Sequence, residues 1–177
     1  TSGSTGRPKG VVVPHRATAN FLASMAREPG LQSSDVLVAV TTLSFDIAVL
    51  ELFGPLSVGA EILLATREEA TDGSALAQLL TTQVATMMQA TPAGWRLLLQ
   101  TSWLPPYGFR ALCGGEPLSA DLAEQLLARG CELWNMYGPT ETTVWSTCWR
   151  VEHPERGISI GTPIANTTIH ILDEHGQ

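Results

Sequence analysis

Short apolar runs alternate with longer stretches of helical periodicity along most of this 177-residue chain. Strands are expected at residues 11–13, 36–40, 61–65, 84–88, 110–113 and 131–136, and helices at residues 15–27, 46–58, 74–83, 92–99 and 119–129. Ser119 and Gly130 are residue types that begin and end helices. Apolar strands separated by helices are typical of a parallel sheet covered on both faces. The sequence therefore predicts an α/β fold, a mainly parallel sheet flanked by helices, with further strands from Val144 onward.

The balance of charge excludes several classes of function. The chain has 10 Lys and Arg against 17 Asp and Glu, a net charge of −7, and no basic run, which argues against nucleic-acid and anionic-membrane binding. No apolar stretch approaches the ~18 residues of a transmembrane helix, and the polar first residues do not form a signal peptide. Cys113, Cys131 and Cys148 form no CxxC pair, which is typical of reduced thiols. We therefore expect a cytoplasmic protein.

The first ten residues, TSGSTGRPKG, are the most informative segment. Glycines let the backbone turn tightly and bring its N–H groups close to a polyphosphate, and hydroxyl groups donate to phosphate oxygens. Arg7 and Lys9 add positive charge to an acidic chain. The segment is not a Walker A loop, because Pro8 precedes Lys9 and Gly10 follows it. Taken alone, it is explained about as well by a flexible linker.

TSGSTGRPKG resembles the phosphate-binding loop of the adenylate-forming enzymes, which include acyl-CoA synthetases, luciferases and the adenylation domains of nonribosomal peptide synthetases. Further matches follow in order. Residues 45–53 are similar to the amino-acid-binding helix of the peptide synthetase branch, 114–116 to the glycine turn beside adenine, and 135–143 to the adenine and magnesium motif. Residues 160–167 resemble the next strand-turn, with Thr162 where Lys or Arg is frequent. The resemblance identifies residues 1–177 as a partial AMP-binding domain, the central part of the large N-terminal domain, and we expect truncation at both ends.

The resemblance implies that the chain binds ATP and Mg²⁺. Tyr137 would stack on the purine, a contact worth ~1–3 kcal/mol in other base–aromatic pairs, and Glu141 would hold Mg²⁺. Lys9, Thr140 and Glu141 are the expected catalytic residues. The residues expected to bind the nucleotide are Thr1, Ser2, Gly3, Ser4, Thr5, Gly6, Gly114, Gly115, Glu116, Asn135, Tyr137 and Gly138. Outside this context, Tyr137 is more simply a strand-end tyrosine, Glu141 a solvated carboxylate and Thr140 a turn residue.

Asp46 separates the branches of this superfamily. Its neighbours Phe45 and Ile47 are apolar, and a carboxylate in such surroundings needs a partner. It is either the N-cap of its helix or the counter-ion of a substrate α-ammonium group. The resemblance favours the second role, because peptide synthetase adenylation domains carry Asp here and acyl-CoA synthetases generally do not.

The same matching places a pocket for the substrate side chain. Its expected lining is Asp46, Ile47, Leu50, Gln89, Leu112, Gly114, Met136, Val144 and Trp145. Gln89, Met136 and Trp145 are large and would fill the pocket, which would reject larger substrates by overlap. We therefore expect glycine as the substrate, with alanine second. Alternatively, several of these residues are plain core, most of all near Gln89 and Leu112.

The activity that the resemblance implies has two steps. An amino acid reacts with ATP to form aminoacyl-AMP and pyrophosphate, and the aminoacyl group then passes to the phosphopantetheine thiol of a peptidyl carrier domain. A condensation domain is the other expected partner. One alternative is an acyl- or aryl-CoA ligase of the same superfamily, against which Asp46 argues. Another is a non-catalytic nucleotide-binding module.

The isolated 177-residue chain should have no useful adenylation activity. The family's ribose-binding aspartate, its catalytic lysine with the small C-terminal domain, and the early N-terminal segment are all expected outside residues 1–177. ATP–pyrophosphate exchange with glycine should therefore stay at the level of a blank without protein. Exchange above that background would contradict this expectation.

Overall fold

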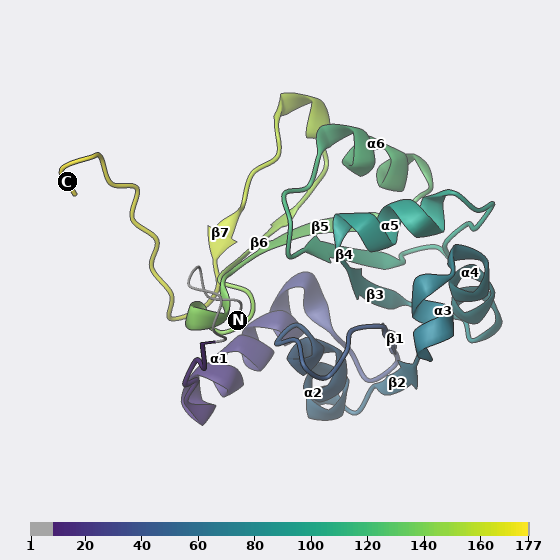
Figure 1. The fold of residues 1–177 in the computed structure, drawn as a ribbon, viewed down its shortest axis with the longest axis horizontal. Helices are drawn as coiled ribbons and strands as arrows, with labels where there is room; N and C mark the ends of the chain where they lie inside the picture. The colour runs from purple at the N-terminus through teal and green to yellow at the C-terminus, as the bar shows by residue number, and fades with distance from the viewer. Residues whose placement is uncertain (1–8, 177) are drawn as a thin grey trace.

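A seven-stranded sheet forms the centre of the structure, a computed structural model that describes residues 9–176. The strands are β1 (Val36–Ala39), β2 (Glu61–Leu64), β3 (Met87–Ala90), β4 (Arg110–Gly114), β5 (Glu132–Tyr137), β6 (Thr147–Arg150) and β7 (Thr162–Pro163). Their order is β2-β1-β3-β4-β5-β6-β7 (Figure 1). Strands β1 to β5 run parallel, and β6 pairs antiparallel with both β5 and β7. The predicted α/β fold with a mainly parallel sheet is confirmed.

Helices cover both faces of this sheet (Figure 1). α1 (His15–Met25) and α2 (Ala48–Val58) lie on one face, and α3 (Arg67–Thr71), α4 (Gly73–Thr82), α5 (Pro92–Leu99) and α6 (Ala120–Ala128) lie on the other. The short turns η1 (Ala26–Gly30), η2 (Thr140–Thr142) and η3 (Pro154–Arg156) occur in the connections. Ser119 caps α6 as predicted, because its hydroxyl accepts a hydrogen bond from the Leu122 N–H at 3.3 Å. Within residues 9–176, no helix has the length and apolar character needed to cross a bilayer.

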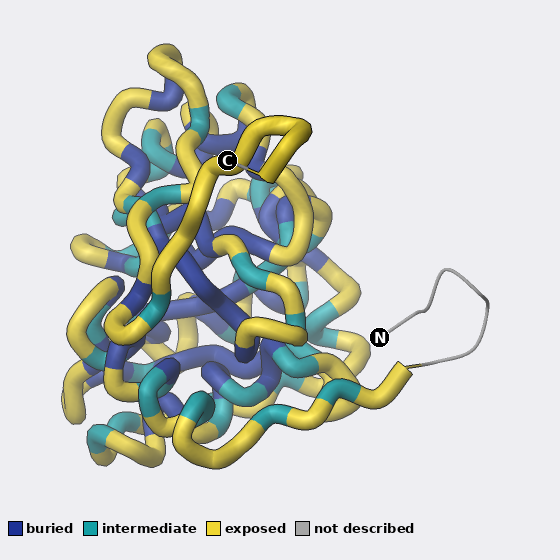
Figure 2. The backbone as a smooth tube through the Cα atoms, turned by 90° about the vertical axis from the view of Figure 1, so that its left-hand side faces the viewer, coloured by how far each residue is buried: buried dark blue, intermediate teal, exposed yellow. Residues whose placement is uncertain are grey.

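The central strands divide their side chains between two hydrophobic cores, since successive residues of a strand point to opposite faces. On β3, Met87 belongs to the core beneath α1 and α2, and Met88 belongs to the core beneath α4, α5 and α6. On β4, Leu112 and Ala111 are divided in the same way. The buried strands run through the interior, beneath a more exposed outer layer (Figure 2). Burial on both faces explains why these strands are continuously apolar in the sequence.

Two predictions of local structure are wrong. Residues 11–13 form no strand: Val12 is 96% exposed, and no strand lies beside it in the described part of the chain. The strand expected at 84–88 begins only at Met87, because Val84 and Ala85 close the turn after α4 with N–H bonds to the carbonyls of Thr81 and Leu80. The further strands expected after Val144 are confirmed as β6 and β7, whereas residues 164–176 are irregular.

The three cysteines are free and buried. Burial raises the pKa of the Cys113 and Cys131 thiols to about 12 and that of Cys148 to about 11. Thiols with such pKa values stay protonated at neutral pH and are poor nucleophiles. They are therefore packing residues of the two cores.

A buried ion pair joins Asp35, just before β1, to Arg110, the first residue of β4. Arg110 also donates to the Gly30 carbonyl, and Asp35 accepts from the Gln32 N–H at 2.7 Å and the Thr86 hydroxyl at 2.8 Å. Burial acts to raise the pKa of the Asp35 carboxyl, but the hydrogen bonds from Arg110, Gln32 and Thr86 outweigh it and leave the pKa below 3.8. This cluster ties η1 to the amino-terminal edge of the sheet.

Substitution Asp35→Asn should destabilise the fold, because it leaves the Arg110 guanidinium buried without a counter-charge. We expect the free energy of unfolding at neutral pH to fall by about 3 kcal/mol. The folded-state pKa of Asp35 is lowered, so its contribution is present above about pH 3.8 and is lost as the pH falls below that value. Urea denaturation should therefore show a difference between wild type and variant that narrows in acid. A difference independent of pH would contradict this account.

Candidate functional site

A cavity of about 380 Å³ lies at the carboxyl ends of β4 and β5. Its walls are the loop after β4, the end of β5 with the loop that follows it, and the segment between β6 and β7. The lining residues are Gly115, Glu116, Pro117, Leu118, Asn135, Met136, Tyr137, Gly138, Pro139, Trp145, Ile158 and Ile160. Small-molecule sites typically measure about 300–1,000 Å³. In α/β proteins, ligands bind at this edge of the sheet.

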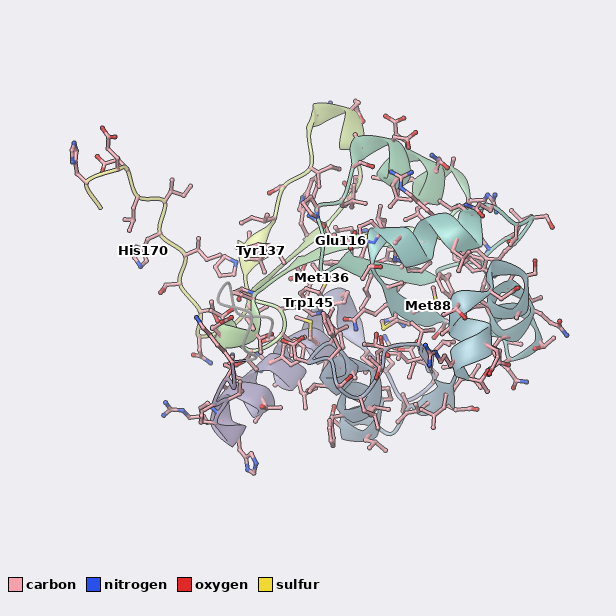
Figure 3. All side chains as sticks on the ribbon, viewed as in Figure 1. Met88, Glu116, Met136, Tyr137, Trp145 and His170 are labelled. Atoms are coloured by element: carbon pink, nitrogen blue, oxygen red, sulfur yellow. The ribbon has the colours of Figure 1, made fainter. Side chains whose placement is uncertain are left out.

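Five residues expected from the sequence to bind a nucleotide line this cavity: Gly115, Glu116, Asn135, Tyr137 and Gly138. Glu116, Met136, Tyr137 and Trp145 lie together at this end of β4 and β5, whereas His170 lies apart on the C-terminal tail (Figure 3). Tyr137 is 49% exposed, which leaves its ring accessible to a planar ligand. Asn135 is buried and donates from Nδ2 to the Ser159 carbonyl at 2.7 Å. This hydrogen bond holds the segment between β6 and β7, which forms the opposite wall of the cavity.

Two glycines of the site allow chain segments to approach one another closely. A Cβ on Gly138 would lie 2.5 Å from the Val144 carbonyl oxygen and 2.6 Å from the Ser146 nitrogen. A Cβ on Gly114 would lie 2.6 Å from the Met136 carbonyl oxygen and 2.7 Å from Cη2 of Trp145. These distances are shorter than any side chain tolerates. Only glycine at both positions lets Trp145 lie against β4 and β5.

Glu141 lies on η2, in the loop that continues from the cavity wall at Gly138 and Pro139. Its carboxylate is exposed and has no hydrogen bond or ion pair to any other described residue. In residues 9–176, no cluster of three or more His, Cys, Asp or Glu could hold a metal. The carboxylates at this site are thus Glu141 and, in the cavity lining, Glu116. This fits Mg²⁺, which is often held by one or two carboxylates together with phosphates and water.

Asp46 does not cap its helix. α2 begins at Ala48 after Ile47, and no side chain caps its first turn. The Asp46 carboxylate is half-buried, and within the described part of the chain it has no hydrogen bond or ion pair. It lines a cavity of about 100 Å³ together with Val13, Thr18, Val49, Thr140, Thr143 and Val144. The N-cap role considered for Asp46 is therefore excluded, and no residue among 9–176 neutralises its charge.

Gln89 and Trp145 are brought together although 56 residues separate them in the sequence. The Trp145 indole donates from Nε1 to Oε1 of Gln89 at 2.7 Å. Gln89 Nε2 donates in turn to the Ile47 carbonyl at 3.1 Å and to Oε1 of Glu51 at 3.2 Å. Gln89 and Trp145 are both essentially fully buried. The other residues expected to line the substrate pocket, Ile47, Leu50, Leu112, Met136 and Val144, pack around them in the core beneath α1 and α2.

The backbone that leads to Trp145 is strained. Thr143 and Val144 have φ values of 72° and 64°, in the left-handed region that β-branched residues rarely adopt. Each such residue costs on the order of 1–3 kcal/mol and persists only where its surroundings hold it. The Ser146 N–H donates to the Tyr137 carbonyl at 2.8 Å, and the Trp145 indole is bonded to Gln89. These two bonds, made by the residues directly after the strained pair, hold Trp145 in place.

Most of the expected phosphate loop lies outside the described residues. This applies to Thr1, Ser2, Gly3, Ser4, Thr5, Gly6 and Arg7. Lys9 is described and exposed, and it does not belong to the lining of the 380 Å³ cavity. The phosphate-binding role of this segment stays a prediction.

Comparison with protein families finds a match to the AMP-binding enzymes over residues 1–177. The chain belongs to this family. Among curated AMP-binding proteins, it is 45% identical over 174 residues to the dimodular nonribosomal peptide synthase of Bacillus subtilis. It is 44% identical over 174 residues to a PKS-NRPS hybrid synthetase of Aspergillus candidus. Each alignment covers 98% of this chain and 7% of the relative, so the chain spans a small part of the proteins it matches.

Solved structures of AMP-binding proteins share this fold. The holo form of a four-domain nonribosomal peptide synthetase bound to AMP and glycine matches with a TM-score of 0.92 at 44% identity, over 96% of this chain and 13% of that one. A nonribosomal peptide synthetase protein containing adenylation and PCP domains matches with a TM-score of 0.86 at 31% identity, over 100% of this chain and 37% of that one. The sheet of this AMP-binding chain is therefore that of an adenylation domain.

One buried residue behind the site, Glu51, was missed in the sequence. It is completely buried on α2, where Oε2 accepts from the Thr41 N–H at 2.9 Å and Oε1 from the Thr41 hydroxyl at 2.6 Å. Burial raises the pKa of the Glu51 carboxyl, and the hydrogen bonds from Thr41 and Gln89 offset this only in part. The signal was present, since Glu51 stands inside an apolar run, as Asp46 does.

Proposed function

We propose that this chain is the central part of an adenylation domain in nonribosomal peptide synthesis. The domain would activate an amino acid, glycine in preference to alanine, as aminoacyl-AMP with release of pyrophosphate. The aminoacyl group would then be loaded as a thioester onto the phosphopantetheine of a carrier domain, with a condensation domain as a further partner. Membership of the AMP-binding family and the similarity to peptide synthetases support this proposal.

The unpartnered carboxylate of Asp46 carries the proposal. A half-buried charge without a partner is unfavourable unless a ligand compensates it. The cation of matching size and charge is the α-ammonium group of an amino acid. Asp46 lies beside Val144, and Val144 directly precedes the buried Trp145. If the ammonium group of the substrate is held there, the Trp145 indole would limit the space for the side chain of the substrate.

In the proposed reaction, a carboxylate oxygen of the amino acid attacks the α-phosphorus of ATP. A new C–O–P linkage forms, the bond from the α-phosphorus to the bridging oxygen breaks, and that oxygen leaves with pyrophosphate. Asp46 would hold the ammonium group, and Thr140, which lines the same small cavity, would donate to the α-phosphate. Tyr137 would stack on the base, and Lys9 would neutralise the outer phosphates. Mg²⁺ bound by Glu141 would supply positive charge among the phosphate oxygens.

The preference for glycine is argued from the space that Trp145 occupies. The indole lies against Gly114 and is bonded to Gln89, and both large side chains are buried. A substrate side chain that points toward them would overlap with the indole. Overlap discriminates strongly against larger substrates, whereas a missing methylene costs only about 1–3 kcal/mol. The glycine-bound synthetase at 44% identity supports the same choice.

An acyl- or aryl-CoA ligase of the same superfamily is the second candidate. Its substrate has no ammonium group, so it would leave the Asp46 charge uncompensated. A non-catalytic nucleotide-binding module is a third candidate, and it would leave the same charge without a ligand.

Substrate preference tests the proposal directly. A complete adenylation domain in which this chain supplies residues 1–177 should support ATP–pyrophosphate exchange with glycine. Exchange with alanine should be at least about tenfold slower, because its methyl group meets the indole. Larger amino acids should be slower still. A domain that prefers a bulky amino acid would overturn the glycine assignment.

Substitution Asp46→Ala should abolish amino-acid activation in the same complete domain. Removing one partner of a close charge pair typically costs 2–5 kcal/mol, so we expect kcat/KM for glycine to fall roughly 100-fold or more. Glu124→Ala, which removes an exposed carboxylate from α6, is the control and should leave exchange unchanged. Normal glycine activation by Asp46→Ala would favour the ligase alternative.

A further inference from the structure

Behind Trp145, a continuous chain of hydrogen bonds runs along the carboxyl edge of the sheet. It starts at Thr41, after β1, passes through Glu51 on α2 and Gln89 on β3, and ends at the Trp145 indole. Glu51 is fully buried, and neither of its oxygens lines the cavities described above. The reaction proposed above assigns this carboxylate no role.

The chemistry of Glu51 determines which way the Gln89 amide points. Both oxygens of Glu51 accept hydrogen bonds from Thr41, so this carboxyl group acts as an acceptor, and the Ile47 carbonyl likewise only accepts. Gln89 must therefore turn its NH₂ group toward both, at 3.2 Å and 3.1 Å. This leaves Oε1 of Gln89 as the acceptor for the indole N–H of Trp145 at 2.7 Å. In the reverse orientation, the Gln89 NH₂ would face the indole N–H, and the bond would be lost.

The orientation of Gln89 in turn fixes the indole. On one side, the ring lies so close to Gly114 that a Cβ there would be 2.7 Å from Cη2. On the other side, the indole Nε1 donates its hydrogen bond to Oε1 of Gln89. Contact with Gly114 prevents the ring from tilting toward β4. Tilting in the other direction would break the hydrogen bond between the indole N–H and Gln89.

We propose that Glu51 is a positioning residue that sets the size limit for the substrate side chain, acting through Gln89 on Trp145. The inference rests on the proposed function, because it specifies how the amino-acid pocket of that site is kept small. It requires that a change at Glu51, which lies behind the pocket wall, alters substrate selection. A purely structural Glu51 would alter stability alone.

The test is Glu51→Gln in the complete domain. The substituted side chain has the same shape, but one of its two oxygens becomes an NH₂ donor, so the Ile47 carbonyl alone would hold the Gln89 amide in its present orientation. We expect kcat/KM for alanine relative to glycine, measured by ATP–pyrophosphate exchange, to rise about tenfold as the indole is released. Thr41→Val, which removes the Thr41 hydroxyl that donates to Glu51, should shift the ratio in the same direction by less.

A spectroscopic readout separates positioning from general loosening. In domain labelled with ¹⁵N-tryptophan, the Trp145 indole N–H signal can be assigned by its disappearance in Trp145→Phe. In Glu51→Gln without substrate, this signal should move upfield and exchange faster with solvent, as expected for a lost hydrogen bond. The indole signal of Trp95, which donates to the Leu112 carbonyl at 3.1 Å, should not change.

Asp35→Asn is the matched control. Asp35 is also a buried carboxylate with several donors, but it lies at the opposite end of the same strands. It should lower stability without changing the alanine-to-glycine ratio or the Trp145 signal. If Asp35→Asn shifts the ratio as much as Glu51→Gln does, the effect is one of stability and the inference fails.

The remaining outcomes separate this inference from the function on which it rests. If the wild-type domain prefers a bulky amino acid, the proposed function fails before Glu51 is considered. If the wild-type domain prefers glycine, but Glu51→Gln and Thr41→Val leave the ratio or the Trp145 signal unchanged, the inference about Glu51 alone is overturned. A raised ratio together with a shifted Trp145 signal supports both.

Discussion

Parallel strands all end at the same edge of a sheet, and the candidate site depends on this constraint. Asp46 follows β1, Gln89 lies near the end of β3, and Gly114 and Tyr137 end β4 and β5. Residues spread over almost a hundred positions therefore meet at one edge, where backbone hydrogen bonds between strands hold them in register. This rigid edge allows a small cavity and a buried indole to keep a defined shape.

The two ends of these strands carry buried carboxylates in opposite electrostatic surroundings. At the amino ends, the Arg110 guanidinium and neutral donors hold the pKa of Asp35 below its usual value. At the carboxyl ends, Glu51 has only neutral donors, and burial raises its pKa. The ion pair ties secondary-structure elements together, whereas the hydrogen-bond network around Glu51 sets the orientation of the Gln89 amide. The amino-terminal end of the sheet thus serves stability, and the other end faces the cavities.

Local sequence patterns predicted the order of strands and helices well, because hydrophobic periodicity depends only on neighbouring residues. They failed where the wider structure overrides local preference. Val84 is β-branched, yet it adopts a φ of 50° in the turn after α4, and the run at residues 11–13 has no neighbouring strand in residues 9–176. The residues that family resemblance selected around Tyr137 do gather at one cavity, although their contacts with a nucleotide stay a prediction.

The sequence by itself determined the α/β class through its hydrophobic periodicity and the family through its motifs, and the resemblance to that family selected the candidates Asp46, Gln89, Tyr137 and Trp145. Only the tertiary structure decided that Asp46 has no partner among residues 9–176, that Trp145 is bonded to Gln89, and that Glu51 stands behind them. The physical reason is that a hydrogen bond between residues 56 positions apart depends on how strands align and how glycines let segments approach. No local pattern in the chain carries that information.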